Sequence, residues 1–92
     1  MKGMRAIITV IGQDKVGICA KVSTVCAEHN VNITAVSQNI FDDVFCMVMM
    51  TETDKLDINF GEFAELLKEE GKTMVLDIRV MHEDIFNSMH KI

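Results

Sequence analysis

Residues 4–11 read Met-Arg-Ala-Ile-Ile-Thr-Val-Ile, and the loop-forming sequence Gly-Gln-Asp-Lys-Val-Gly follows at residues 12–17. In the first stretch both alternating sets of positions are mainly apolar, which is typical of a strand in the interior of a sheet. Apolar residues then recur at helical spacing over residues 18–29. The chain is therefore expected to open with a strand, a loop and a helix.

Three further strands are expected after this helix. Residues 32–41 and 44–52 are rich in β-branched and apolar residues, and Asp42-Asp43 between them favours a tight turn. Residues 73–81 alternate between apolar and polar side chains. Asn30 is predicted to end the first helix in the left-handed conformation, because asparagine tolerates a positive φ.

Two more helices complete the pattern. Asn59-Phe-Gly-Glu62 has the form of a capping box, in which the first and last side chains bond the backbone at a helix start. Gly71 is predicted to end this helix at the C′ position. Residues 83 to about 91 place apolar side chains at helical spacing, so a short amphipathic helix is expected at the C-terminus.

The order β-α-β-β-α-β predicts an α+β fold of the ferredoxin-like type, a βαββαβ sandwich with a short C-terminal helix. We expect one domain over residues 1–92, with its core in residues 4–81, because no change in composition marks a linker. Both central helices would cover one face of the sheet. The other face carries Ile7 and Ile11, and we expect the terminal helix or a second subunit to cover it.

Composition excludes several classes of protein. The 92 residues include 9 Lys+Arg and 14 Asp+Glu, a net charge of -5, which argues against a nucleic-acid partner. The apolar runs are far shorter than the ~20 residues of a membrane span, and no signal-peptide pattern follows the N-terminus. Three cysteines without a Cys-x-x-Cys motif are typical of reduced thiols in a cytoplasmic protein.

No catalytic, metal-binding or cofactor site is indicated. Ser23 and Ser37 lack a nucleophile elbow, and no His or Cys pair has metal-ligand spacing. Cys19 lies in a first helical turn, where a thiol pKa can be lowered, although packing roles are favoured for all three cysteines. A small hydrolase of the same topology is the least favoured hypothesis, because the first loop offers Lys15 but no arginine for a phosphoryl group.

The loop after the first strand is a candidate binding site. Gly12 and Gly17 would let the backbone approach a ligand. The amides of residues 16–18 would point outward at the helix start and favour a carboxylate. Asp14 suits an ammonium group, and an α-amino acid carries both groups about 3 Å apart. Asn32 would add a donor and an acceptor.

A purely structural interpretation of the same residues is also open. Asp14 would then cap the helix, and Asn32 would bond the preceding turn. Gly17 would only make room where the helix packs on the sheet. The spacing alone does not decide between the two interpretations.

The stretch from Ile8 to Ile18, followed by a helix and Asn30-Val-Asn-Ile33, resembles the ACT domain, a small regulatory module that binds amino acids in many metabolic enzymes. The resemblance covers residues 4 to about 81. Its most specific element is Asp14-x-x-Gly17-Ile18. The C-terminal residues resemble the tail of a family of stand-alone ACT proteins, and the domain is also similar to the ACT modules of the glycine cleavage system transcriptional repressor.

This resemblance implies a non-catalytic regulatory protein that binds a small molecule, an amino acid by preference. It also implies a homodimer in which two domains form one eight-stranded sheet, with ligands at the interface. The implied ligand-binding residues are Gly12, Asp14, Val16, Gly17, Ile18, Asn32 and Ile33. Without an output domain, the protein would act in trans on a protein partner. The alternative is a structural or adaptor oligomer whose ligand loop is vestigial.

Overall fold

A computed structural model describes residues 4–13 and 16–90, with positions 86, 87, 89 and 90 described by their backbone alone. The elements, in chain order, are β1 (Arg5–Gln13), α1 (Ile18–Glu28), β2 (Asn32–Phe41), β3 (Val44–Glu52), α2 (Phe60–Thr73), β4 (Leu76–His82) and α3 (Glu83–His90). This is the predicted βαββαβ order with a terminal helix.

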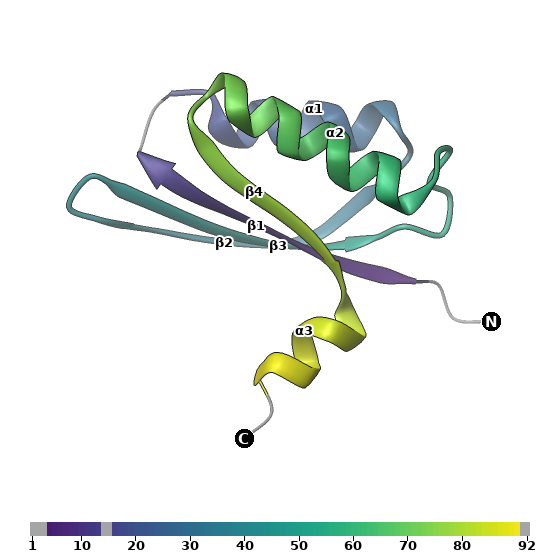
Figure 1. Cartoon of the computed structure of the whole chain (residues 1–92). Helices are drawn as coiled ribbons and strands as arrows, with labels where there is room; N and C mark the ends of the chain where they lie inside the picture. Colours follow the sequence, from purple (N-terminus) through teal and green to yellow (C-terminus); the bar gives the residue numbers. More distant parts are fainter. Residues whose placement is uncertain (1–3, 14–15, 91–92) are drawn as a thin grey trace.

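The four strands form one antiparallel sheet in the order β2-β3-β1-β4. The prediction that the first strand lies in the sheet interior is thus confirmed. Figure 1 shows α1 and α2 side by side on one face of the sheet and α3 on the opposite side. The fold is the ferredoxin-like sandwich that the sequence predicted.

The core fills the space between the sheet and the two covering helices. Its members come from every strand except β2, and from both helices. Side chains that are at most 1% exposed in this cluster are Ile8, Val10, Val22, Cys26, Met47, Met49, Phe63 and Leu67. Ile8 and Val10 of β1 both point into this core, because every second residue of a strand points to the same face.

The first helix ends as predicted. Asn30 has φ 63°, and its N–H donates to the Ala27 oxygen at 3.3 Å. The N–H of Val31 donates to the Cys26 oxygen at 2.9 Å, which completes a Schellman motif. Val31 and Cys26 are both buried in the core, so the same turn that stops α1 directs the chain into β2.

The predicted capping box at the start of α2 is also confirmed. The Asn59 side chain accepts hydrogen bonds from the N–H groups of Gly61 (2.7 Å) and Glu62 (3.4 Å), and the Glu62 side chain accepts one from the Asn59 N–H (3.3 Å). These bonds satisfy amides that have no partner inside the helix.

The prediction for Gly71 is wrong. The helix continues to Thr73, and Gly71 is a buried interior residue. A Cβ atom at this position would lie 2.8 Å from the Leu76 oxygen and 2.9 Å from Ile78 Cγ1. The glycine therefore serves the close approach of α2 to β4. Its sequence context, near the end of a helical pattern, resembles that of a C′ glycine.

Val75 occupies the left-handed C′ position instead, with φ 57°. This conformation is unfavourable for a β-branched residue, and the side chain is 78% exposed, so little packing offsets the strain. We expect Val75→Asn to raise the free energy of unfolding by about 1 kcal/mol. Urea unfolding measures the change, and Val16→Asn, at another fully exposed valine, serves as control. Equal effects of the two substitutions would contradict the strain at Val75.

The sheet face opposite α1 and α2 is only partly covered. α3 packs against β1 and β4, and Ile7 on that face is 1% exposed. Farther along the same face Ile11 is 49% and Val48 40% exposed. The expectation that the terminal helix covers this face therefore holds for one end of the sheet.

Side-chain contacts join four elements near the end of β4. The Arg5 guanidinium pairs with the Glu83 carboxylate through two nitrogen atoms, one of them Nε at 3.0 Å from Oε1. This hydrogen bond, followed by the charge of Glu83, raises the pKa of Arg5. Next to it, the rings of Phe60 and His82 stack with centroids 4.0 Å apart. The first strand, the second helix and the terminal helix are thereby joined at one corner.

Candidate functional site

The glycine-flanked connection between β1 and α1 begins the candidate site. Gly17 is the N-cap of α1 in the left-handed conformation, with φ 91° and no side-chain cap. Among the described residues, no atom apart from the neighbouring backbone lies within 4 Å of the position that a Cβ would take. Gly17 is therefore required for its backbone conformation. The structural interpretation, which gave Gly17 a role in helix–sheet packing, is not supported.

The residues around Gly17 differ sharply in exposure. The Val16 side chain is 99% exposed, whereas Ile18 is 2% exposed and anchors the first turn of α1 in the core. The Gly17 oxygen accepts a hydrogen bond from the Lys21 N–H at 3.0 Å. Within the described part of the chain, no hydrogen bond is found from the amides of residues 16–18. Asp14 lies outside the described residues.

Gly12 lies in the last part of the first strand. It belongs to β1 and not to the loop, and it pairs with Phe45 on one side and Leu76 on the other. A Cβ at Gly12 would lie 2.6 Å from Leu76 Cδ2 and 3.1 Å from the Val75 oxygen. Gly12 thus makes room for the start of β4, and its backbone takes part in the sheet.

Asn32 and Ile33 lie at the other end of the sheet. Asn32 is paired with Glu52, which also faces Arg5 at the beginning of β1, whereas Gln13 at the end of β1 faces Val44. The Asn32 Nδ2 donates to the Glu52 carboxylate at 3.3 Å. Ile33 is half-buried against the core. One chain therefore does not bring the loop and Asn32 together, since α1, 11 residues or about 16 Å long, separates them.

A polar cavity of about 240 Å³ adjoins Asn32. Its lining residues are Asn30, Asn32, Glu52, Asp54 and Lys55. The last three were not among the predicted site residues, because a strand end and a charged loop carry no motif. Carboxylates and an ammonium group at one place suit a small ligand that bears charges of both signs.

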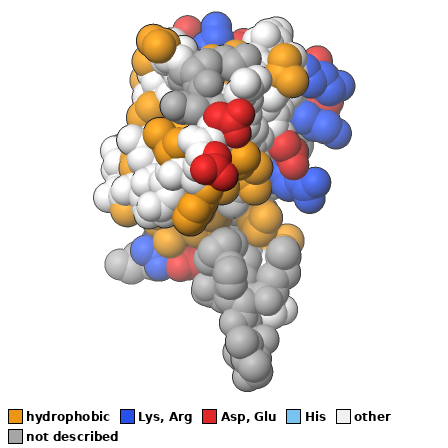
Figure 2. Space-filling view, turned by 90° about the vertical axis from the view of Figure 1, so that its left-hand side faces the viewer, with side chains coloured by type: hydrophobic (Ala, Val, Ile, Leu, Met, Phe, Trp, Pro, Cys, Tyr) orange, Lys and Arg blue, Asp and Glu red, His pale blue; other side chains and the backbone are white. Residues whose placement is uncertain are grey.

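The edge strand β2 has an unusual composition. Its ten residues contain no Lys, Arg, Asp, Glu or Pro, which are the residues that commonly prevent an edge strand from pairing. Val36, Ile40 and Phe41 are 44%, 55% and 67% exposed. Figure 2, viewed from the hairpin end of the sheet, shows hydrophobic side chains gathered there around two acidic ones. This edge is suited to accept another strand.

The cysteines and histidines of the described residues form no reactive cluster. Burial raises the pKa of Cys26 to about 11, so its thiol remains protonated and serves packing. Cys19 is exposed and Cys46 half-buried. His29 Nδ1 lies 2.8 Å from Asp57 Oδ1, which ties the end of α1 to the segment before α2. Among the described residues, no three His, Cys, Asp or Glu side chains lie together as metal ligands would.

Comparison with known proteins adds the following. A family model described as the ACT domain matches residues 5–81. A UPF0237 protein of Methanosarcina acetivorans is 44% identical over 92 residues, which is 100% of both chains. The structure of an ACT domain protein from Streptococcus pneumoniae superposes with a TM-score of 0.80 at 35% identity, covering 92% of this chain and 96% of that one.

A more distant structure shares the fold alone. It is described as a glycine cleavage system transcriptional repressor and superposes with a TM-score of 0.72 at 20% identity. The match covers 89% of this chain and 47% of that one. Within the described residues, no helix is both long and apolar enough to cross a membrane.

Proposed function

Because this chain belongs to the ACT domain family, whose members are regulatory ligand-binding modules, we propose that it is a non-catalytic protein that binds an amino acid between two copies of itself. It would act in trans on a protein partner in the cytoplasm. The observation that carries the proposal is the placement of the Gly17 loop and Asn32 at opposite ends of α1. When two halves of a site lie at opposite ends of the folded domain, a two-fold axis between two copies can bring them together.

The edge of β2 supports this two-fold arrangement. If the β2 strands of two copies pair antiparallel, the beginning of one strand lies beside the end of the other. Asn32 of one copy then approaches the hairpin end of the second copy, where the second copy's loop lies. The same pairing would satisfy the open backbone groups of β2 and would bury Val36 and part of its apolar surroundings.

The chemistry of the two halves is complementary to an amino acid. The amides of residues 16–18 and the N-terminal end of the α1 dipole favour the carboxylate. The ammonium group would be held by Asp14 and by the carboxylate that Asn32 contacts, Glu52. Ile33 would line the apolar part of the site. Such a ligand regulates by binding one arrangement of the dimer more tightly than another, typically by about 1–3 kcal/mol.

A thermal-shift screen of the full chain against the twenty amino acids tests the proposal. We expect one or two to bind, and at a hundredfold excess over Kd the added stability is about 2.7 kcal/mol. For a domain of this size that corresponds to a rise in Tm of roughly 10 °C or more. Light scattering on the same samples is expected to give the mass of a dimer.

Asp14→Ala is expected to abolish the shift while the protein remains folded, because the ammonium loses its charged partner. Asp84→Ala, at an exposed position of α3, removes the same charge at the end of the sheet opposite to the loop and is expected to leave the shift intact. Binding that survives Asp14→Ala would show that the loop is wrongly assigned. A folded dimer that responds to none of the twenty would favour the adaptor role.

A further inference from the structure

A groove runs along the edge of the sheet that is formed by β4. Two cavities, of about 310 and 440 Å³, share Lys68, Asp77 and Ile78 and so form one depression between α2 and β4. We call it the α2–β4 groove, and its lining residues are Ala64, Glu65, Lys68, Lys72 and Val75–Val80. It lies at one edge of the sheet, and the β2 strand that the proposed function uses forms the other edge.

The strand that borders this groove is an edge strand. β4 pairs with β1 on one side, and no described strand lies on its other side. In an edge strand every second residue directs its N–H and C=O groups outward. The groove therefore offers a row of backbone donors and acceptors to an added strand, as in recognition by β-augmentation.

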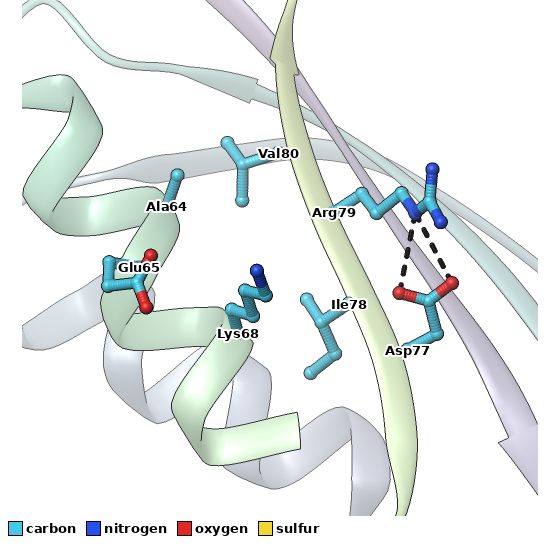
Figure 3. A pocket seen from close by; sticks show the side chains of 7 residues that line it. All are labelled: Ala64, Glu65, Lys68, Asp77, Ile78, Arg79 and Val80. Carbon is cyan, nitrogen blue, oxygen red and sulfur yellow. Dashed lines mark hydrogen bonds and ion pairs between the residues drawn. The ribbon is translucent and has the colours of Figure 1, made fainter. Parts of the chain in front are cut away.

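Lysine side chains give the groove its charge. Figure 3 shows the Lys68 ammonium extending from α2 toward β4, whereas the Glu65 carboxylate lies on the side of α2 away from that strand. No carboxylate of a described residue forms an ion pair with Lys68, and Lys72 pairs only with its helix neighbour Glu69 at 3.3 Å. In Figure 2, Lys and Arg side chains gather along the right-hand side, with acidic side chains among them.

On the side of β4 away from α2, the two charged side chains neutralise each other. The Arg79 Nε lies 3.2 Å from a carboxylate oxygen of Asp77, and in Figure 3 both side chains extend from β4 on the side away from α2. An added strand would thus meet the Lys68 ammonium, which has no ion-pair partner among the described residues, on its helix-facing side and a neutralised pair on the other. A second copy of this edge would bring lysines against lysines, which disfavours self-pairing.

The spacing of the lysines matches that of a strand. Lys68 and Lys72 are one helical turn apart, which is about 6 Å along the axis of α2. Residues i and i+2 of an extended peptide point to the same side and lie about 6.8 Å apart. Two acidic residues separated by one residue would therefore face the two lysines together.

We propose that the α2–β4 groove binds an extended acidic segment of a partner protein as a fifth strand beside β4. Backbone hydrogen bonds to β4 supply the docking, and Lys68 and Lys72 select carboxylates at alternate positions of the segment. This inference goes beyond the proposed function, because it needs neither a ligand at the Gly17 loop nor pairing through β2. It identifies a surface through which this domain can contact its target.

The probe for this proposal is a capped hexapeptide that alternates glutamate and valine, titrated into the ¹⁵N-labelled full chain. We expect the largest amide shifts in β4 between Asp77 and Val80, together with slower hydrogen exchange in that strand. The Lys68→Glu/Lys72→Glu variant is expected to bind at least about tenfold more weakly, because two attractions become repulsions. That variant should instead bind the peptide in which lysine replaces glutamate.

Two controls make the result decisive. Lys55→Glu carries the same change of charge at the far end of the sheet, and it is expected to bind the acidic peptide as the unmodified protein does. Glutarate, a small dianion without a peptide backbone, is expected not to shift the β4 amides. The proposal is wrong if millimolar peptide leaves β4 unshifted, if the double variant binds equally well, or if glutarate reproduces the shifts.

Discussion

Truncation of Phe63 to alanine is expected to lower the free energy of unfolding by about 3–5 kcal/mol. The ring is 0% exposed and lies in the cluster that joins α2 to the sheet. It also meets the edge of His29 with ring centroids 6.4 Å apart, so its loss would loosen the end of α1. A domain of this size has a total stability of about 5–15 kcal/mol, and the variant is therefore expected to be close to unfolding.

Phe60→Ala provides the matched control for this prediction. It removes the same ring one turn earlier in α2, where the side chain is only half-buried and stacks on His82. We expect a loss of about 1–2 kcal/mol, since less area is returned to water. Urea unfolding with a common m-value measures both, and equal losses would mean that Phe63 is not the centre of the core.

Alanine at Gly71 is expected to destabilise the protein by about 2–3 kcal/mol, although alanine is normally the better helix former by about 1 kcal/mol. The new Cβ would lie 2.8 Å from the Leu76 oxygen. This oxygen belongs to the backbone and cannot move without shifting β4. The helix would have to separate from the strand that it covers.

Gly61→Ala makes the same replacement in the first turn of α2. There the Cβ would lie 3.1 Å from the Asn59 side chain, which is at the surface and can move. We expect a change of less than about 1 kcal/mol in either direction. A Gly71→Ala protein that is as stable as the Gly61→Ala protein, measured by thermal and urea unfolding, would contradict the close approach of α2 to β4.

Local sequence signals predicted most of the fold. The strands at residues 32–41 and 44–52 have the expected bounds, because their β-branched runs end at an Asp-Asp turn and at polar residues. Asn30 and the capping box at Asn59 act as predicted, since a cap depends on residues within one turn. Gly71 was misinterpreted for the opposite reason, because it provides space for β4, which follows α2 in the chain and leaves no signal at the glycine itself.

The candidate site was predictable only in part. Gly17 could be recognised, because glycine adopts a positive φ more readily than any other residue and is therefore favoured at such a helix start. The position of Asn32 relative to the loop could not, since it depends on the direction of α1 and, in the proposed dimer, on the second copy. No sequence motif marks the α2–β4 groove. Lys68 and Lys72 border a groove only because β4, which follows them in the chain, lies beside α2.

The pairing of Ala6 with His82 has a practical consequence. The first strand begins and the fourth strand ends at the same end of the sheet, while Gly12 and Leu76 mark the other. A tag joined ahead of β1 would begin beside the end of the sheet that carries Asn32 and Glu52, because Glu52 pairs with both Arg5 and Asn32. Such a tag is therefore best cleaved before ligand binding is measured, although the β1–α1 turn and the hairpin lie at the opposite end of the sheet.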